Sequence, residues 1–463
     1  MKTPGRWLLA AAAAFFVLPT GTALAANRMP IGFFDDISFR YSSDRDANLA
    51  SAAATGATVI HTNVNWSTVA PTRPADPSSG DDPAYQLGNL DDLVFQSGLF
   101  GMRVMINITG TPKWANGNQT PNHMPTKLSD LTTFANMLAT RYDGEHGHGS
   151  VGLYSVWNEP NLQLFLTPQY SGTKIVGPSN YAKLYKAAYS GIKAGNPLAQ
   201  VAIGETSARG RDKPLASASA SVAPATFARL LSQVKGLKFD AWAHHPYPTS
   251  PNLPPLQKVR YPNVTLSTLP QFEKDLNKWF HRTVPIWITE YGHETKPGEP
   301  HGVTTSVQAK YAKQALSIAK ADPNIQMFVW FTFRDSSSNP WQSGLENASG
   351  SHKPSYAAFT SIAKTTDGQS VAARAGKAPK VRIFVPYLGH FSPPGTQIGI
   401  FYTVYDGTKV VARATPTGVL GLDESVSFTP AFTPAKGHTY NIVAVANEPN
   451  GHTETRTTYV TVL

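Results

Sequence analysis

Eight short apolar runs, separated by segments with helical periodicity, restrict the fold of this chain more than any other feature. Several runs are apolar at consecutive positions, which is typical of strands that are buried on both faces of a parallel sheet. Between them, segments such as 131–138, 181–192 and 307–318 repeat apolar residues with the i, i+3, i+4, i+7 spacing of an amphipathic helix. The runs begin at Ile31, Thr58, Met102, Val151, Gln200, Phe239, Pro285 and Ile325.

Strands and helices that alternate in this way predict an α/β fold, a closed (β/α)8 TIM barrel, over residues 26–365. An open, doubly wound sheet is the alternative, although no glycine-rich phosphate loop follows the first run. The connections after the runs are long and rich in Pro, Gly, Ser and Asn, and in a barrel they form the face where active sites are built. Weaker helix candidates complete the set of eight at 46–56, 87–100, 222–236, 268–281 and 354–364.

The composition changes after Lys364. Residues 366–379 are small, polar and interrupted by Gly and Pro, so they are interpreted as a linker. In residues 380–463, apolar positions alternate with period two in short runs that are separated by turn sequences such as Pro-Asn-Gly-His. This pattern predicts a small all-β domain, an immunoglobulin-like β-sandwich. The chain has no cysteine, so that sandwich lacks a disulfide.

The first 25 residues have the layout of a secretory signal peptide. Lys2 and Arg6 precede an apolar run over 8–18, and Ala23 and Ala25 form a small-residue cleavage site. The apolar run is too short to span a bilayer, which requires roughly 20 residues. We therefore expect a protein without a membrane span that is exported and is extracellular, periplasmic or associated with the cell wall.

Composition excludes several functions. Without cysteine there are no disulfides, no thiolate metal sites and no cysteine nucleophile. The formal charge is +10, but Lys and Arg are scattered and form no block, so nucleic acid is not an expected partner. His244 and His245 are adjacent and would point to opposite faces of a strand, and no carboxylate motif accompanies them. We expect neither a metal nor a cofactor.

Two glutamates stand at the ends of apolar runs, where a barrel opens to solvent. Glu159 lies in Trp-Asn-Glu-Pro-Asn after the fourth run, and Glu290 lies in Ile-Thr-Glu-Tyr-Gly at the end of the seventh. Cleavage of a glycosidic bond requires two carboxyl groups, one to protonate the leaving oxygen and one to act at the anomeric carbon. The pattern indicates a glycosidase, although two structural glutamates in a cleft would produce the same sequence.

These motifs resemble the signatures of clan A glycoside hydrolases, which are retaining (β/α)8-barrel enzymes, and the similarity is of the family 39 and family 5 type. The resemblance covers residues 30 to about 365. It includes the His-x-Tyr after the sixth run, formed here by His245 and Tyr247, and an aromatic residue in the eighth run, Trp330. Trp66 and Pro71, after the second run, also fit the family pattern.

The resemblance implies a role for each residue. Glu159 would be the acid/base, Glu290 the nucleophile, Asn158 a ligand of the sugar 2-hydroxyl, Tyr247 a donor to the nucleophile and Trp330 the platform under the sugar. The acid must stay protonated near neutral pH, which apolar walls or a nearby negative charge favour. A tyrosine hydroxyl that donates to the nucleophile favours its ionised form.

One position departs from the family. The arginine that often supports the nucleophile from the second strand is replaced by His61, and an acidic residue after that strand is replaced by Ala70. A histidine is not reliably charged at pH 7, so the subfamily and the substrate stay open. His61, His245 and the loop residue Trp114 are nevertheless expected to contact substrate. Trp341 is a second candidate for stacking on a sugar. Four other acidic residues near strand ends are expected to form salt bridges or loop caps, namely Asp35, Asp36, Glu205 and Asp335.

The sequence thus predicts a secreted, retaining glycoside hydrolase that acts on an oligosaccharide or polysaccharide. Two alternatives use the same residues, a carbohydrate-binding protein without catalysis and a transglycosylase. The C-terminal domain is expected to be a spacer or to pack on the barrel, and contact with glycan or cell wall is the alternative.

Overall fold

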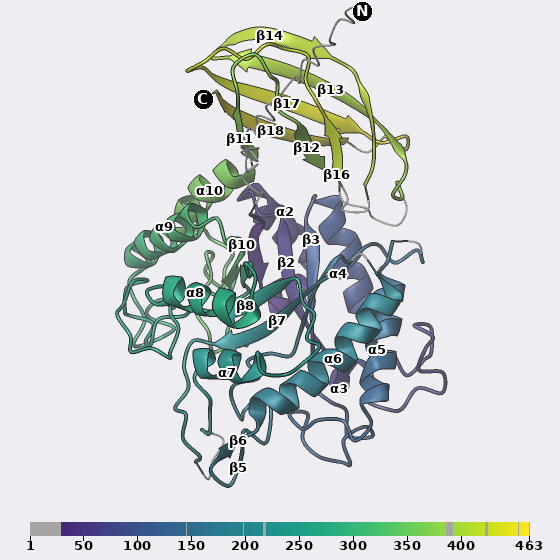
Figure 1. The fold of residues 1–463 in the computed structure, drawn as a ribbon, viewed down its shortest axis with the longest axis vertical. Helices are drawn as coiled ribbons and strands as arrows, with labels where there is room; N and C mark the ends of the chain where they lie inside the picture. Colours follow the sequence, from purple (N-terminus) through teal and green to yellow (C-terminus); the bar gives the residue numbers. More distant parts are fainter. Residues whose placement is uncertain are drawn as a thin grey trace, which may run out of the picture.

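The computed structural model describes residues 29–144, 146–197, 199–215, 219–367, 369–385, 392–421, 425–451 and 453–462. The predicted signal peptide lies outside the described residues. Figure 1 shows a barrel surrounded by helices and, beyond one end of it, a second domain made of strands.

Eight parallel strands close into a barrel, as the apolar runs predict. Around the barrel their order is β1-β10-β9-β8-β7-β4-β3-β2, so each strand pairs with its neighbours in the chain order of the eight and the last pairs with the first. The strands are β1 (Ile31–Phe34), β2 (Val59–Asn65), β3 (Arg103–Thr109), β4 (Leu153–Val156), β7 (Gln200–Ser207), β8 (Ala241–His245), β9 (Ile286–Ile288) and β10 (Ile325–Phe331).

A helix of at least eight residues follows each strand, and each overlaps a segment predicted from its periodicity. No helix in the described part of the chain is long and apolar enough to cross a membrane. The eight helices are α2 (Arg45–Ala54), α4 (Gly88–Leu99), α5 (Leu128–Arg141), α6 (Gly177–Gly195), α7 (Pro224–Leu231), α8 (Leu269–Phe280), α9 (Thr305–Ala321) and α10 (Pro354–Asp367). Short elements inside the loops are α1 (Asp36–Phe39), α3 (Trp66–Val69) and the hairpin β5 (Tyr170–Ser171) and β6 (Lys174–Ile175).

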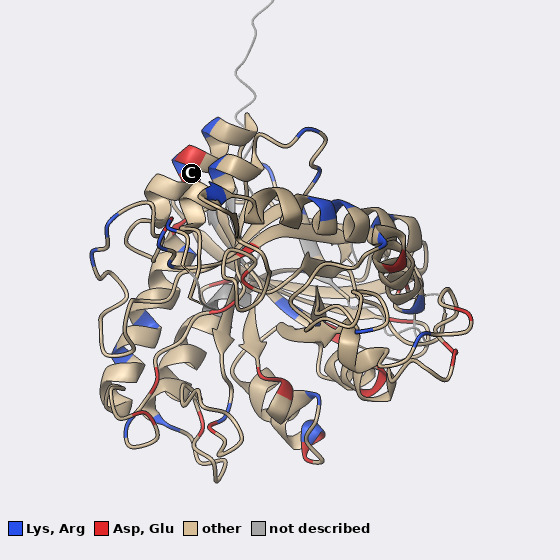
Figure 2. Ribbon diagram, turned by 90° about the horizontal axis from the view of Figure 1, so that it is seen from below, with Lys and Arg blue, Asp and Glu red and all other residues tan. Residues whose placement is uncertain are grey.

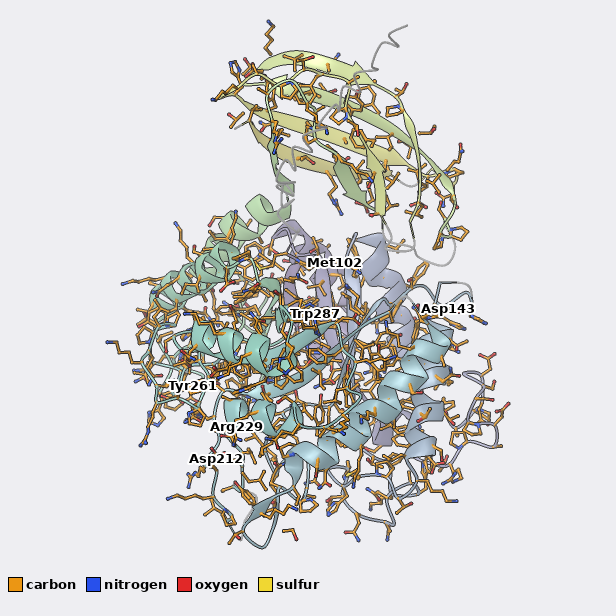
Figure 3. The ribbon with its side chains drawn as sticks, viewed as in Figure 1. Met102, Asp143, Asp212, Arg229, Tyr261 and Trp287 are labelled. Carbon is orange, nitrogen blue, oxygen red and sulfur yellow. The ribbon has the colours of Figure 1, made fainter. Side chains whose placement is uncertain are left out.

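The interior of the barrel changes from apolar to polar along the strands. An apolar cluster that includes Met105, Leu153 and Trp287 fills its centre, and Trp287 is seen among the strands in Figure 3. Side chains two positions apart on a strand point to the same face, so residues further along the same strands form a second layer inside the barrel. That layer is fully buried and carries polar atoms, from His61, Asn107, Ser155, Glu205, His245 and Thr289.

The C-terminal domain consists of two sheets around its own apolar core. Strand β11 pairs with β18 inside the segment that was predicted as a linker, so that boundary was wrong. The partner strand lies more than 80 residues later, so local composition carries no sign of it. One sheet holds β11 (Gln369–Ala373), β18 (Thr453–Val462), β17 (Thr439–Asn447), β13 (Gln397–Asp406), β14 (Lys409–Ala414) and β15 (Thr417–Val419), and the other holds β12 (Val381–Phe384) and β16 (Ser425–Phe428).

The C-terminal domain lies at the end of the barrel where the strands begin. Met102, just before β3, faces this domain in Figure 3, whereas Asp212, in the loop after β7, lies at the opposite end. Gly101 lies against the carboxylate of Glu454 on β18. The loops that follow the strands are therefore on the far side of the barrel from the C-terminal domain (Figure 1).

The carboxylate of Asp35 joins the first strand to the last. It accepts hydrogen bonds from the backbone N–H of Ser38 at 3.0 Å, Phe333 at 3.1 Å and Arg334 at 3.0 Å, and from the Ser38 hydroxyl at 2.7 Å. Asp35 is 2% exposed. It caps α1 and holds the loop after β10 against the end of β1, which agrees with the structural role expected for it.

Replacement of Asp35 by Ala should destabilise the barrel by about 3 kcal/mol, because buried donors lose their acceptor. Chemical denaturation measures this loss. The matched control is Asp92→Ala, since that side chain is 62% exposed and has one ion pair with Arg45. An exposed pair of this kind contributes about 0.5 kcal/mol. Equal losses in the two variants would contradict the role of Asp35.

Candidate active site

The loops after the strands surround an acidic centre. Figure 2 looks along the barrel from this side, and acidic segments lie near the middle of the ring of loops. The described part of the chain holds no group of three or more His, Cys, Asp or Glu side chains arranged to bind a metal ion.

Glu159 and Glu290 converge on one nitrogen atom. His245 Nδ1 lies 3.1 Å from Glu159 Oε1 and 3.7 Å from Glu290 Oε2, so these oxygens are separated by no more than the sum of the two distances. The two glutamate side chains are 15% and 11% exposed and thus reach solvent. Retaining glycosidases have carboxyl groups about 5–5.5 Å apart and inverting enzymes about 6.5–9.5 Å apart. The largest distance between the two oxygens that these contacts allow lies at the short end of the inverting range. The shorter separation of retaining enzymes is compatible with the same contacts.

A neutral side chain also contacts Glu290. The Tyr247 hydroxyl donates to Glu290 Oε2 at 3.2 Å, as the resemblance implies. Burial raises the pKa of Tyr247 well above its usual value, and the charge of Glu290 adds to this, so the hydroxyl keeps its proton. Burial also raises the pKa of Glu290, and the positive charge of His245 opposes that effect.

His245 lies below the glutamates and is fully buried. Its Nδ1–H donates to Glu159 Oε1 at 3.1 Å and its Nε2–H donates to Glu205 Oε2 at 2.7 Å. Burial alone would lower the pKa of His245, but the charge of Glu290 and the bonds to Glu159 and Glu205 raise it well above its usual value. The predicted contact of His245 with substrate has no support from this geometry, because the ring is enclosed and its two nitrogens are engaged by carboxylates.

His61 is fully buried in the same polar layer, so its predicted contact with substrate also has no support from its surroundings. Its Nδ1–H donates to the carbonyl of Thr289 at 3.1 Å, and its ring packs on Phe34 with centroids 4.5 Å apart. Burial lowers the pKa of His61 to about 4, so the ring is neutral at pH 7. It supplies no positive charge to Glu290. Asn158 lies beside Glu159, and its Oδ1 has no hydrogen-bond partner among the described residues.

The surroundings of Trp330 do not support its predicted place under the sugar. Trp330 is fully buried, and its indole N–H donates to the carbonyl of Ser343 at 2.9 Å. On β10 it points outward into the core below the helices, whereas the next residue, Phe331, points into the barrel. The exposed aromatic residue is Trp341, which is 39% exposed and packs 5.5 Å from the ring of Tyr247 and 5.9 Å from that of Phe331.

Trp114 has contacts that point away from the glutamates. Its indole N–H donates to the carbonyl of Ala70 at 2.8 Å, its ring packs edge-on against Trp66, and the Arg73 guanidinium covers it at 4.4 Å. None of these contacts joins Trp114 to Glu159 or Glu290, so its predicted place in the substrate site has no support from its neighbours.

A closed (β/α)8 barrel with glutamates after its fourth and seventh strands defines the class of clan A glycoside hydrolases, which the sequence motifs resemble. Residues 25–335 match the family model described as cellulase, glycosyl hydrolase family 5. The match covers more than half of the chain, so the chain belongs to this family and is a glycoside hydrolase. No curated protein matches the chain in sequence.

Solved structures agree on the fold. A glucosidase from Croceicoccus marinus is 12% identical with a TM-score of 0.56, over 90% of this chain and 96% of that chain. A family 39 β-xylosidase from Caulobacter crescentus is 16% identical with a TM-score of 0.51, over 88% and 96%. A GH5_18 protein from Streptomyces cattleya, in complex with GlcNAc, is 15% identical with a TM-score of 0.52, over 73% and 81%. At these identities the similarity concerns the fold alone.

Proposed function

We propose that this protein is a secreted, retaining glycosidase that cleaves O-glycosidic bonds of an oligosaccharide or polysaccharide. Glu159 is the acid/base and Glu290 the nucleophile. The observation that carries the proposal is the convergence of both carboxylates on His245 Nδ1, at 3.1 and 3.7 Å, with Tyr247 donating to Glu290. Two glutamates with only a structural role would not need to share one buried cation at the mouth of a barrel.

The reaction proceeds in two displacements. Glu290 attacks the anomeric carbon while Glu159 donates its proton to the leaving oxygen, and a covalent glycosyl-enzyme forms. Glu159 then removes a proton from water, which attacks the same carbon and releases Glu290. The Tyr247 hydroxyl and the charge of His245 favour the carboxylate form of Glu290 at the start and at the end of the cycle.

The sugar that is attacked would lie against Trp341. The indole is the exposed aromatic surface next to Tyr247, and stacking on such a surface is how proteins hold the apolar face of a pyranose ring. Asn158 Oδ1 is buried without a hydrogen-bond partner among the described residues, and an unsatisfied acceptor beside Glu159 fits the role expected for Asn158 at the sugar 2-hydroxyl. The family name and the neighbours' descriptions point to β-glucan, xylan and GlcNAc-containing glycans as the first substrates to test.

Replacement of Glu290 by Ala should lower turnover on the true substrate by on the order of 10⁴-fold while the protein stays folded, because the nucleophile is lost. Replacement of Glu159 by Ala should cost on the order of 10²–10⁴-fold on natural glycans and less on aryl glycosides, whose leaving groups need no acid. A fluorinated glycoside that traps the covalent intermediate should label Glu290, as read by mass spectrometry.

The matched control for these variants is Asp46→Ala, an exposed carboxylate on α2. A Glu290→Ala enzyme with undiminished activity would refute the assignment. A wild-type protein that binds glycan without turnover would instead be a carbohydrate-binding protein, and transfer of the glycosyl group to an added sugar would identify a transglycosylase.

Removal of the Trp341 ring should raise KM about tenfold with little change in kcat, because stacking contributes about 0.5–1.5 kcal/mol beyond the area it buries. Steady-state kinetics of Trp341→Ala test this. The comparison is Trp114→Phe, which should keep the KM of the wild type because that ring packs on Trp66 and Arg73. A larger rise in KM for Trp114→Phe than for Trp341→Ala would exchange the two roles.

Export should remove residues 1–25. The chain recovered from the medium or periplasm of an expressing bacterium is expected to begin at Ala26, because Ala23 and Ala25 present small side chains to the signal peptidase. Intact-mass measurement determines the new terminus. An Ala25→Arg variant should retain residues 1–25, because its cleavage site is blocked. Recovery of the wild-type chain with Met1 still attached would argue against secretion by this route.

A further inference from the structure

Glu205 takes no part in double displacement, yet its carboxylate makes the shortest contact of His245, at 2.7 Å. We propose that Glu205 is a positioning residue that holds the second proton of His245, so that this imidazolium supplies the positive charge beside the catalytic carboxylates. The proposal rests on the proposed function, because it assigns the charge a task in the glycosidase reaction.

Three carboxylates surround a single imidazole ring. The side chains of Glu159, Glu205 and Glu290 all approach His245, and every ion pair found for these glutamates in the described part of the chain is with that ring. Buried carboxylates that share a site oppose one another's ionisation, and a nearby positive charge offsets that effect. In the described part of the chain, His245 is the group that forms ion pairs with both catalytic residues and can provide that charge.

The other titratable groups around His245 are neutral. His61, on β2, is held uncharged by burial and points its Nδ1–H to the Thr289 carbonyl. His244, the preceding residue, faces away from the barrel axis, and burial lowers its pKa to about 3. Its Nε2–H donates to the carbonyl of Val264 at 2.9 Å. Tyr247 contributes a neutral hydroxyl, so the balance of charge depends on three glutamates and one imidazolium.

The surroundings of Glu205 favour its anionic form. The Thr289 hydroxyl donates to Glu205 Oε2 at 2.7 Å, on the same oxygen that receives the His245 proton. Burial would raise the pKa of Glu205, but the hydrogen bond and the charge of His245 outweigh it, so the pKa is lowered overall. An anion fixed at Nε2 keeps that proton on His245, and Nδ1–H then stays available to Glu159.

The backbone of β7 is distorted so as to aim Glu205 inward. Its pairing with β8 shifts between Ile203 and Thr206, where two residues of β7 oppose one residue of β8, which marks a β-bulge. Bulges re-aim side chains and occur next to active sites. Glu205 itself has φ +45°, a left-handed conformation that costs about 1 kcal/mol or more in a residue other than glycine. Without the extra residue, the alternation from Ala202 would turn Glu205 toward the helices.

The test is the pH dependence of kcat/KM for Glu205→Gln, which keeps the shape of the side chain and removes its charge. We expect kcat to fall tenfold to a hundredfold with KM within twofold. The variant removes the Glu205 charge, which raises the pKa of Glu290, and with it the His245 charge, which lowers that pKa by more. The acidic limb should therefore move to higher pH, because the loss of the positive charge outweighs the loss of the negative one. Activity lost at pH 6 should therefore return in part at higher pH. The matched control is Glu273→Gln, a buried carboxylate on α8 at 5% exposure, which should keep the wild-type profile.

A second measurement does not depend on turnover. In ¹⁵N NMR spectra of the whole protein, both ring nitrogens of His245 should carry protons at pH 8, and in Glu205→Gln the second proton should be lost at lower pH. Thr289→Val removes one donor to Glu205. It should shift the acidic limb and the loss of the second His245 proton in the same directions, but by less. This variant replaces Glu205→Gln in the test if Glu205→Gln does not fold.

The outcomes separate the two proposals. An active wild type whose acidic limb and His245 protonation are unchanged in Glu205→Gln overturns the role of Glu205. If the wild type hydrolyses no glycoside, the proposed function fails. A His245 proton that still depends on Glu205 would then support the charge arrangement but not its use in catalysis.

Discussion

The imidazole of His245 and the carboxylates around it form the interaction on which the active-site end of the barrel depends. Two hydrogen bonds, at 3.1 Å to Glu159 and at 2.7 Å to Glu205, fix the ring, and Glu290 lies within 3.7 Å of it. These residues come from four strands or strand ends that are far apart in the sequence. Charges at this depth are stable only when they are paired and hydrogen-bonded. The geometry of the ring therefore also determines the relative positions of the two candidate catalytic glutamates.

The fold supplies this geometry through simple alternation. Several strands place an apolar side chain in the centre of the barrel and a polar one two positions later, such as Met105 and Asn107 on β3, so an apolar core lies directly below a polar layer. The C-terminal domain lies at the opposite end, where the strands begin. It can contribute to stability or to attachment without touching the sugar that is being cleaved. The loops and strand ends at the other end of the barrel form the site.

Much of this arrangement could be predicted from the sequence, and the exceptions have specific causes. The strands and helices follow from apolar periodicity, and Glu159 and Glu290 follow from their motifs. Trp330 was assigned to the site because the eighth strand holds an aromatic residue there, but Trp330 and Phe331 lie on opposite faces, and a family motif does not fix which face a neighbouring residue takes. The inward aim of Glu205 depends on a bulge, which shifts the alternation by one residue. Pairing between strands, rather than local composition, determines such a shift.

The replacement of arginine by His61 and the presence of Glu205 follow from one electrostatic requirement. In similar enzymes an arginine on the second strand supports the nucleophile and needs no partner to stay charged. A histidine in that layer is neutral here, because burial lowers its pKa to about 4 despite the nearby charge of Glu205, and the partner found for its ring among the described residues is the carbonyl of Thr289. A histidine that is bonded to a buried carboxylate keeps its charge. His245 has such a partner in Glu205 and His61 does not, so the positive charge beside Glu290 belongs on the sixth strand of the barrel rather than on the second.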